Sequence, residues 1–217
     1  DLAPLDLRAV RAVPMARRAS KVDAADAARP WSPGGSFAGF LERLPGILAA
    51  ADLKAVIAAI STAASSAKPV IFAMGAHVIK VGLGPIVVDL MERRVISGVA
   101  MNGAGIIHDL EMALHGRTSE DVGPALGDGT FGMAAETPGF LNRALAAAPP
   151  PPAGLGHLVG EAILAAGLPF AGQSILAAGA RLGLPVTVHV AVGTDILHMH
   201  PGFDPGHHVG ATRPGGA

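Results

Sequence analysis

Short apolar runs alternate with a helical pattern in the middle of the chain. Residues 70–73 and 95–101 are short, mainly apolar runs, and between them the apolar residues recur at helical spacing over 86–94. Gly84-Pro85 precedes this helix and Arg93-Arg94 end it, where a first-turn proline and C-terminal cations are favoured. Two apolar strands joined by a helical crossover predict a parallel βαβ unit whose strands are buried on both faces.

The rest of the chain adds helices and one further strand. Helical spacing recurs over 36–44, 53–66, 155–166 and 174–182, with Asp52 expected to cap the second of these helices, and a third apolar run covers 185–192. Thr118 is expected to cap a short helix, and Thr137-Pro138 to begin another. The glycine-flanked residues 127–133 are either a plain connector or a loop that closes over a binding site.

These elements predict an α/β fold, a Rossmann-like parallel sheet with helices on both faces. Residues 1–35 contain scattered arginines, prolines and a Gly-Gly pair, which predicts an irregular N-terminal arm. A single α/β domain is expected over 36–200, followed at 201–217 by a flexible tail rich in glycine, proline and histidine.

Small residues follow the first two predicted strands, as Gly75-Ala76-His77 and Asn102-Gly103-Ala104-Gly105. Ligands of parallel sheets bind beyond the carboxyl ends of the strands, where small side chains allow close approach and a following helix offers amides to an anion. A nucleotide or another phosphate-bearing ligand is therefore expected at this edge. The alternative is a pair of tight turns without a ligand, because the glycines lack the G-x-G-x-x-G spacing.

Histidines and carboxylates lie near all three predicted strand ends. The set is His77, His108, Asp109, Glu111, Asp195, His198 and His200. Imidazole suits general acid–base chemistry, which we expect of at least one of His77, His108 and His198. A divalent metal bound by His77, His108, His198 and His200 is the alternative. His189 and the 198–200 loop also permit purely structural interpretations.

Composition narrows the function classes. The chain has a formal net charge of -1 and no basic tract, so no nucleic-acid partner is expected, and it contains no cysteine for disulfides or thiolate sites. No uninterrupted apolar run reaches the ~18 residues of a membrane span, and no leader is recognised, so a cytoplasmic location is expected. Hydrophobic residues are 50% and charged ones 15%, which favours burial against a partner unless alanine alone accounts for it.

Two ordered sets of motifs point to a known family. The first comprises His77-Val78-Ile79, Gly82-Leu83, residues 86–91, Ser97-Gly98-Val99-Ala100, Asn102-Gly103-Ala104-Gly105 and Asp109-Leu110; the second comprises Ser174-Ile175-Leu176, Leu184-Pro185-Val186 and Gly193-Thr194-Asp195. Together they resemble the deoxyhypusine synthase family, and most closely its bacterial deoxyhypusine synthase-like members.

The resemblance implies an NAD-binding fold and an NAD-dependent transferase that oxidises a polyamine or related amine and transfers its alkylamine group. It also implies a homo-oligomer, a tetramer in the family. The dinucleotide would be held by Gly75, Ala76, His77, Asn102, Gly103, Ala104, Gly105, Thr194 and Asp195. His108, Asp195 and His198 would be the catalytic residues, with His108 and Asp195 managing protons and the cationic substrate.

The chain departs from the family at several positions. His77 and His108 stand where the family has hydroxyl, amide or carboxylate side chains. The family's imine-forming lysine has no counterpart among Lys21, Lys54, Lys68 and Lys80, of which Lys80 alone is near the predicted site. The alternatives are therefore a metal-dependent hydrolase or lyase on the same scaffold, and a non-catalytic relative that lacks the lysine segment.

Overall fold

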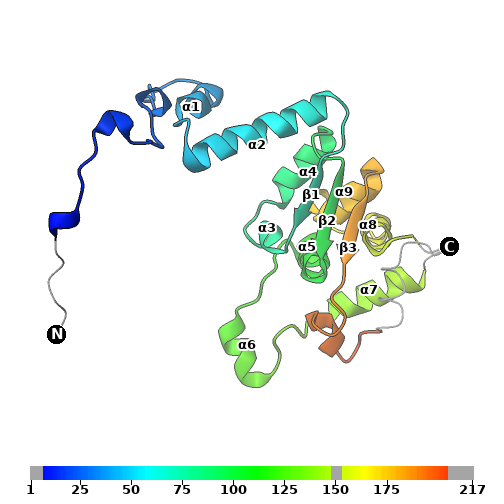
Figure 1. The fold of residues 1–217 in the computed structure, drawn as a ribbon. Helices are drawn as coiled ribbons and strands as arrows, with labels where there is room; N and C mark the ends of the chain where they lie inside the picture. Colours follow the sequence, from blue (N-terminus) through cyan, green and yellow to red (C-terminus); the bar gives the residue numbers. More distant parts are fainter. Residues whose placement is uncertain (1–6, 148–152, 205–217) are drawn as a thin grey trace, which may run out of the picture. The chain divides into compact units, whose positions relative to one another are not determined.

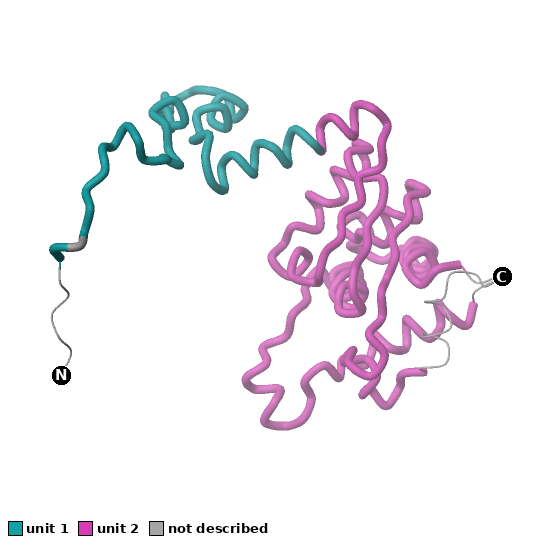
Figure 2. The backbone as a smooth tube through the Cα atoms, viewed as in Figure 1, with its two compact units in different colours: residues 1–59 teal, residues 60–217 magenta. Residues whose placement is uncertain are grey.

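The computed structural model describes residues 7–147 and 153–204. By its internal contacts the chain divides into two compact units, 1–59 and 60–217 (Figure 2). The division lies within a helix, at residues 59/60.

The first unit contains the arm and two helices. Its elements are the 3-10 turns η1 (Leu7–Ala9), η2 (Met15–Arg17) and η3 (Ala24–Asp26), and the helices α1 (Phe37–Arg43) and α2 (Leu48–Ser65), the last of which continues into the second unit. Ser36 caps α1 by accepting a hydrogen bond from Gly39 N at 3.2 Å. The arm is held to this helix, because Arg29 N donates to Arg43 O at 3.0 Å and the Trp31 ring lies 5.9 Å from the Phe40 ring.

Helix α2 is apolar and none of its residues is buried. It begins at Leu48, four residues before Asp52, so the predicted cap is wrong. Its length and mean hydropathy of 1.4 would allow it to cross a membrane, but helices of soluble proteins pass the same test and no membrane location follows. Exposed Leu53, Val56, Ile57 and Ile60 lie at the three- and four-residue spacing of one helix face.

The second unit is built on a three-stranded parallel sheet, with strands β1 (Ile71–Met74), β2 (Gly98–Asn102) and β3 (Val186–His189) in that order (Figure 1). Val99 pairs with Phe72 on one side and with Val186 on the other. The predicted parallel strands and mixed α/β fold are therefore confirmed. The accompanying helices are α3 (His77–Lys80), α4 (Gly84–Glu92), α5 (Gly103–His115), α6 (Val122–Asp128), α7 (Glu136–Ala146), α8 (Leu155–Ala165) and α9 (Ile175–Leu182), with the 3-10 turns η4 (Ala171–Gln173) and η5 (Ile196–Met199).

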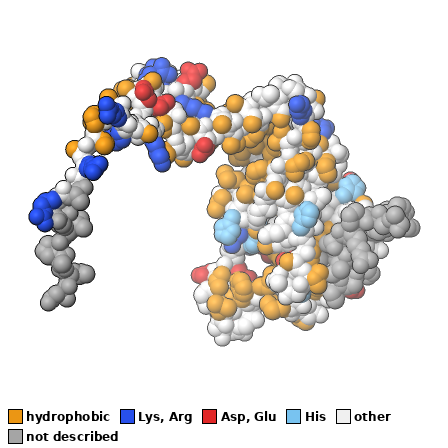
Figure 3. Space-filling view, viewed as in Figure 1, with side chains coloured by type: hydrophobic (Ala, Val, Ile, Leu, Met, Phe, Trp, Pro, Cys, Tyr) orange, Lys and Arg blue, Asp and Glu red, His pale blue; other side chains and the backbone are white. Residues whose placement is uncertain are grey.

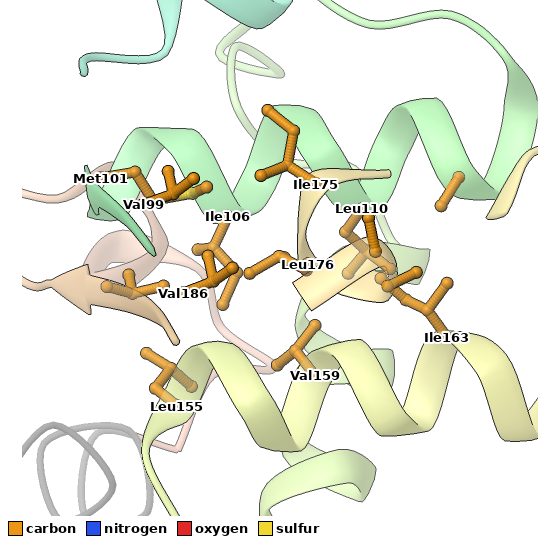
Figure 4. Close-up of a cluster of buried hydrophobic side chains, with 14 of the residues drawn as sticks. Val99, Met101, Ile106, Leu110, Leu155, Val159, Ile163, Ile175, Leu176 and Val186 are labelled. Atoms are coloured by element: carbon orange, nitrogen blue, oxygen red, sulfur yellow. The ribbon is translucent and has the colours of Figure 1, made fainter. Parts of the chain in front are cut away.

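One face of the sheet carries the core. Val99, Met101, Val186 and Val188 are at most 6% exposed and join one hydrophobic cluster with α4, α5, α8 and α9 (Figure 4). Ile106 and Leu110 of α5 face Leu176 of α9 and Val159 of α8 in this cluster, and each is fully buried. The period-2 alternation of the strands therefore points one set of side chains into a single helical layer.

The opposite face of the sheet is exposed. Its residues, which we call the open face, are Ile71, Ala73, Ala100, Thr187 and His189. Ile71 is 60% exposed, and Thr187 and His189 are exposed as well. The prediction of strands buried on both faces is thus wrong for the described residues, because the described helices that share the core pack on the other side.

Candidate functional site

The three strand ends meet at one edge of the sheet, as predicted. A Cβ atom on Gly75 would lie 4.0 Å from Asn102 Nδ2, and one on Gly103 would overlap the Asp195 carboxylate. Asn102 caps α5, since its Oδ1 accepts a hydrogen bond from Gly105 N at 3.0 Å. The structure therefore brings together Gly75, Asn102, Gly103 and Asp195 from the predicted dinucleotide site.

The loop after β3 closes this edge. Asp195 Oδ2 accepts a hydrogen bond from Ala191 N at 3.2 Å, and Thr194 Oγ1 donates to Ala191 O at 3.2 Å. The Asp195 carboxylate thus lies at the amino end of α5, where the partial positive charge of the helix would attract a ligand phosphate. The Asp195 carboxylate therefore occupies the place that a dinucleotide pyrophosphate would take at this helix end, and a pyrophosphate would have to displace it.

A cavity lies beside this edge, along one face of α5. It has a volume of about 800 Å³. Ala104, His108, Glu111 and His115 line it at helical spacing, and the segment 117–138 that carries α6 forms the facing wall. In Figure 3 the second unit is hollowed beside α6, and histidine, basic and acidic side chains gather at the edge of the hollow. Of the predicted cofactor and catalytic residues, only Ala104 and His108 line this cleft.

Three side chains form a hydrogen-bonded group on the wall of the cleft. His108 Nδ1 lies 2.6 Å from Thr118 Oγ1, and Thr118 Oγ1 in turn donates to Glu111 Oε2. His108 Nδ1 is also 3.6 Å from Glu111 Oε2. His108 and Glu111 are 18% and 23% exposed, so the group is largely shielded from water.

The hydrogen bonds of Thr118 determine the tautomer of His108. Burial raises the pKa of Glu111, but the bonds from His108 and Thr118 and the charge of His108 outweigh burial and lower it, so Glu111 is ionised and can only accept. The single proton of Thr118 goes to Glu111, so His108 Nδ1 must carry the hydrogen that it shares with Thr118. In neutral His108 the Nε2 atom then has a lone pair, which makes it a base for a molecule in the cleft.

Asp109, the neighbour of His108, is structural. Its carboxylate accepts hydrogen bonds from Ser174 Oγ at 2.5 Å, Ile175 N at 2.9 Å and Leu176 N at 3.1 Å. These donors form the amino end of α9, so Asp109 joins α5 to α9 inside the core. Burial raises the pKa of Asp109, against the lowering effect of these bonds.

The remaining predicted histidines lie apart from the cleft. His77 is exposed at the start of α3, and His189 Nε2 lies 2.9 Å from Thr187 Oγ1 on the open face. His198 Nδ1 accepts from Gly193 N at 3.2 Å, and His200 Nδ1 accepts from Gly202 N at 3.0 Å. Over residues 7–147 and 153–204 no three histidine, aspartate or glutamate side chains are grouped to hold a metal ion, so the metal alternative has no ligand set there.

Sequence reasoning missed Thr118 and the facing wall. Thr118 was expected to cap a helix, but Asp121 is the N-cap of α6, accepting from Gly123 N, and Ala135 rather than Thr137 precedes α7. The predictable signal was His108 and Glu111, which lie three residues apart on one helix face.

Residues 201–204, predicted as the start of the flexible tail, are bonded to Asn142 through Gly202 O and Asp204 N; residues 205–217 lie outside the described part.

No protein-family model matches the chain, and no curated protein matches its sequence.

Proposed function

We propose that the protein is an enzyme of small amines, a deoxyhypusine synthase-like transferase whose general base is His108. The observation that carries the proposal is the His108–Thr118–Glu111 group on the wall of the 800 Å³ cleft. A base held by a second side chain, which a third side chain orients, is an arrangement that supports proton transfer. Thr118 and Glu111 act as positioning residues, because they touch His108 and set its tautomer.

Proton removal is the step that these residues perform. An amine is bound as its ammonium ion, and it must lose a proton before its nitrogen lone pair can take part in oxidation or transfer. His108 Nε2 accepts that proton, and the resulting imidazolium shares its Nδ1 hydrogen with Thr118, 3.6 Å from the Glu111 carboxylate. The negative charge of Glu111 stabilises the imidazolium.

NAD is the cofactor that the resemblance implies, and when bound it would accept a hydride from the amine. The missing side chain of Gly75 leaves room for a ligand, whereas the Cβ position of Gly103 is filled by the Asp195 carboxylate, which opposes a pyrophosphate at the start of α5. We therefore propose NAD as the cofactor to be tested for binding. Removal of the proton from the ammonium ion is assigned to the chain's own residues.

We also propose that the protein is a homo-oligomer in which a second copy completes the sheet's second layer. Parallel sheets are covered on both faces in nearly all proteins. The open face contains no aspartate, glutamate, lysine or arginine, and α2 carries an exposed apolar stripe. The resemblance, with its two-sided Rossmann-like fold and tetrameric family, supports the same proposal.

Amine oxidation by the His108→Gln variant tests the enzymatic proposal. Wild-type protein should reduce NAD in the presence of spermidine or putrescine, followed by absorbance at the NADH band. The His108→Gln variant should lose 100-fold or more of this rate, because general acid–base catalysis contributes ~10²–10⁴-fold.

The matched control is His157→Gln, which replaces an exposed histidine of α8 outside the cleft and should leave the rate unchanged. Equal rates for His108→Gln and wild type would refute the assignment of the base. A wild-type protein that binds neither amine would refute the proposed function itself.

A further inference from the structure

Helix α2 carries an apolar stripe that the described chain leaves exposed. Its members recur at three- and four-residue spacing and are between 38% and 55% exposed: Leu53, Val56, Ile57 and Ile60. The only charged side chain of residues 53–65 is Lys54, whose ammonium donates to Leu44 O at 2.6 Å. The stripe is therefore an uncharged surface of large aliphatic side chains. Helices of this kind gain most of their stability by packing the apolar face on another surface.

The open face of the sheet is complementary to this stripe. Ala73 pairs with Ala100, and Ala100 pairs with Thr187, so a row of small side chains crosses the middle of the three strands. Small side chains let a helix approach the sheet closely, and large side chains of the helix fill the space that they leave. From Leu53 to Ile60 the stripe is roughly 10 Å long, and four-residue β1 is about 13 Å long, so the two surfaces agree in length.

The end of α2 that belongs to the second unit does not cover its own sheet. Lys68 N donates to Ala63 O at 2.8 Å, and Val70 N donates to Ser97 Oγ at 2.8 Å. These bonds fix the link between α2 and β1 within that unit. Ile71, the first residue of β1, lies next to the link and is nevertheless 60% exposed. A helix that covers the open face therefore has to come from another copy of the chain.

We propose that α2 of one copy packs on the open face of a second copy, and that the second copy returns the same contact. The inference rests on the proposed homo-oligomer and names the element that covers the sheet. Parallel sheets carry helices on both faces, and α2 supplies the layer that the open face lacks. A two-fold axis makes the exchange reciprocal, so the contact closes within a pair of copies. Each copy then buries both its stripe and its open face, which adds to the area of the sheet alone toward the ~800 Å² that a stable interface buries on each partner.

Disulfide cross-linking tests this contact, because the chain contains no cysteine of its own. Full-length Ile57→Cys and Ala73→Cys chains, one of them enlarged by an affinity tag, are co-expressed and oxidised. Non-reducing electrophoresis should show a covalent dimer with one chain of each kind as the main cross-linked product. The matched control replaces Ile57→Cys by Ala58→Cys, an exposed position on the other side of α2. It should give roughly a tenth of that product or less, because cysteines with Cα atoms more than ~7 Å apart do not form a disulfide.

Light scattering of charge variants tests the same contact without a cross-link. Ile57→Asp places a carboxylate in the stripe and should lower the molecular mass of the assembly toward that of the monomer, because a buried unpaired charge is costly. Ala58→Asp introduces the same side chain into the same helix turn outside the stripe and should leave the mass unchanged. Melting temperatures show whether both variants are folded.

The outcomes separate this inference from the proposed homo-oligomer. Cross-links between two Ile57→Cys chains alone would show that the stripe pairs with itself. A cross-link within one Ile57→Cys/Ala73→Cys chain, in place of one between chains, would show that the chain covers its own sheet. Either result, or an Ile57→Asp assembly of wild-type mass, overturns the inference alone. A wild-type protein that is monomeric at all concentrations overturns the inference together with the homo-oligomer.

Discussion

The proposed base, His108, depends on the carboxylate of Glu111. It is 23% exposed, and burial alone would raise its pKa, but the bonds from His108 and Thr118 reverse the shift. A carboxyl whose pKa is lower in the folded than in the unfolded protein stabilises the fold above its unfolded pKa. This stabilisation is lost as the pH falls through the folded pKa.

We therefore expect Glu111→Gln to lower the free energy of unfolding by about 1 kcal/mol at pH 7, the size of one charge-assisted hydrogen bond. The difference from wild type should shrink as the pH falls below about 4.5, the ordinary value for this group. Urea unfolding of both proteins at a series of pH values measures it. Glu161→Gln, an exposed glutamate of α8, is the control and should show no such dependence. A Glu111→Gln difference that stays constant to pH 3 would contradict the lowered pKa.

At the scale of elements, the start of α5 and the loop before η5 form one packed unit. Gly103 has no side chain, and the Asp195 carboxylate occupies the place where a Cβ would be. Gly103→Ala should therefore destabilise the fold by about 2 kcal/mol, as overpacking does. Asp195→Ala should remove the overlap, so the Gly103→Ala/Asp195→Ala double variant should be more stable than the sum of the single effects predicts. Denaturant unfolding of the four proteins measures this coupling, and strict additivity would show that the loop does not rest on Gly103.

The elements that could be predicted from the sequence are those set by local patterns. The apolar runs that became β1, β2 and β3, and the parallel direction of these strands, follow from periodicity. The closeness of Asp195 to Gly103 could not be predicted, because 92 residues separate them and local rules do not fix the path of a loop. Thr118 was misassigned for a related reason: its hydroxyl suits a helix cap equally well, and only tertiary packing brings it to His108.

At the scale of the whole molecule, the open face decides whether this chain functions as a single copy. The helical layer buries Val99, Met101, Val186 and Val188, so every second residue of the sheet has its partner within the unit. The alternate residues face away from this helical layer, and a parallel sheet with one uncovered face is uncommon. A sheet face of three short strands is smaller than the ~800 Å² that each partner buries in a stable interface, so other exposed apolar residues must contribute.

Ala73→Arg tests the second copy directly. Ala73 is exposed on the open face, so arginine can be accommodated in a single chain, whereas a second copy placed there would have to bury its charge. Wild-type protein should therefore elute as a dimer or larger species in size-exclusion chromatography with light scattering, and Ala73→Arg should shift toward the monomer. Ala165→Arg, at an exposed position of α8, should leave the assembly unchanged, and unfolding curves establish that both variants are folded. If wild type is monomeric at all concentrations, or if Ala73→Arg assembles as wild type does, the open face is not the interface and the exposed stripe of α2 becomes the next surface to mutate.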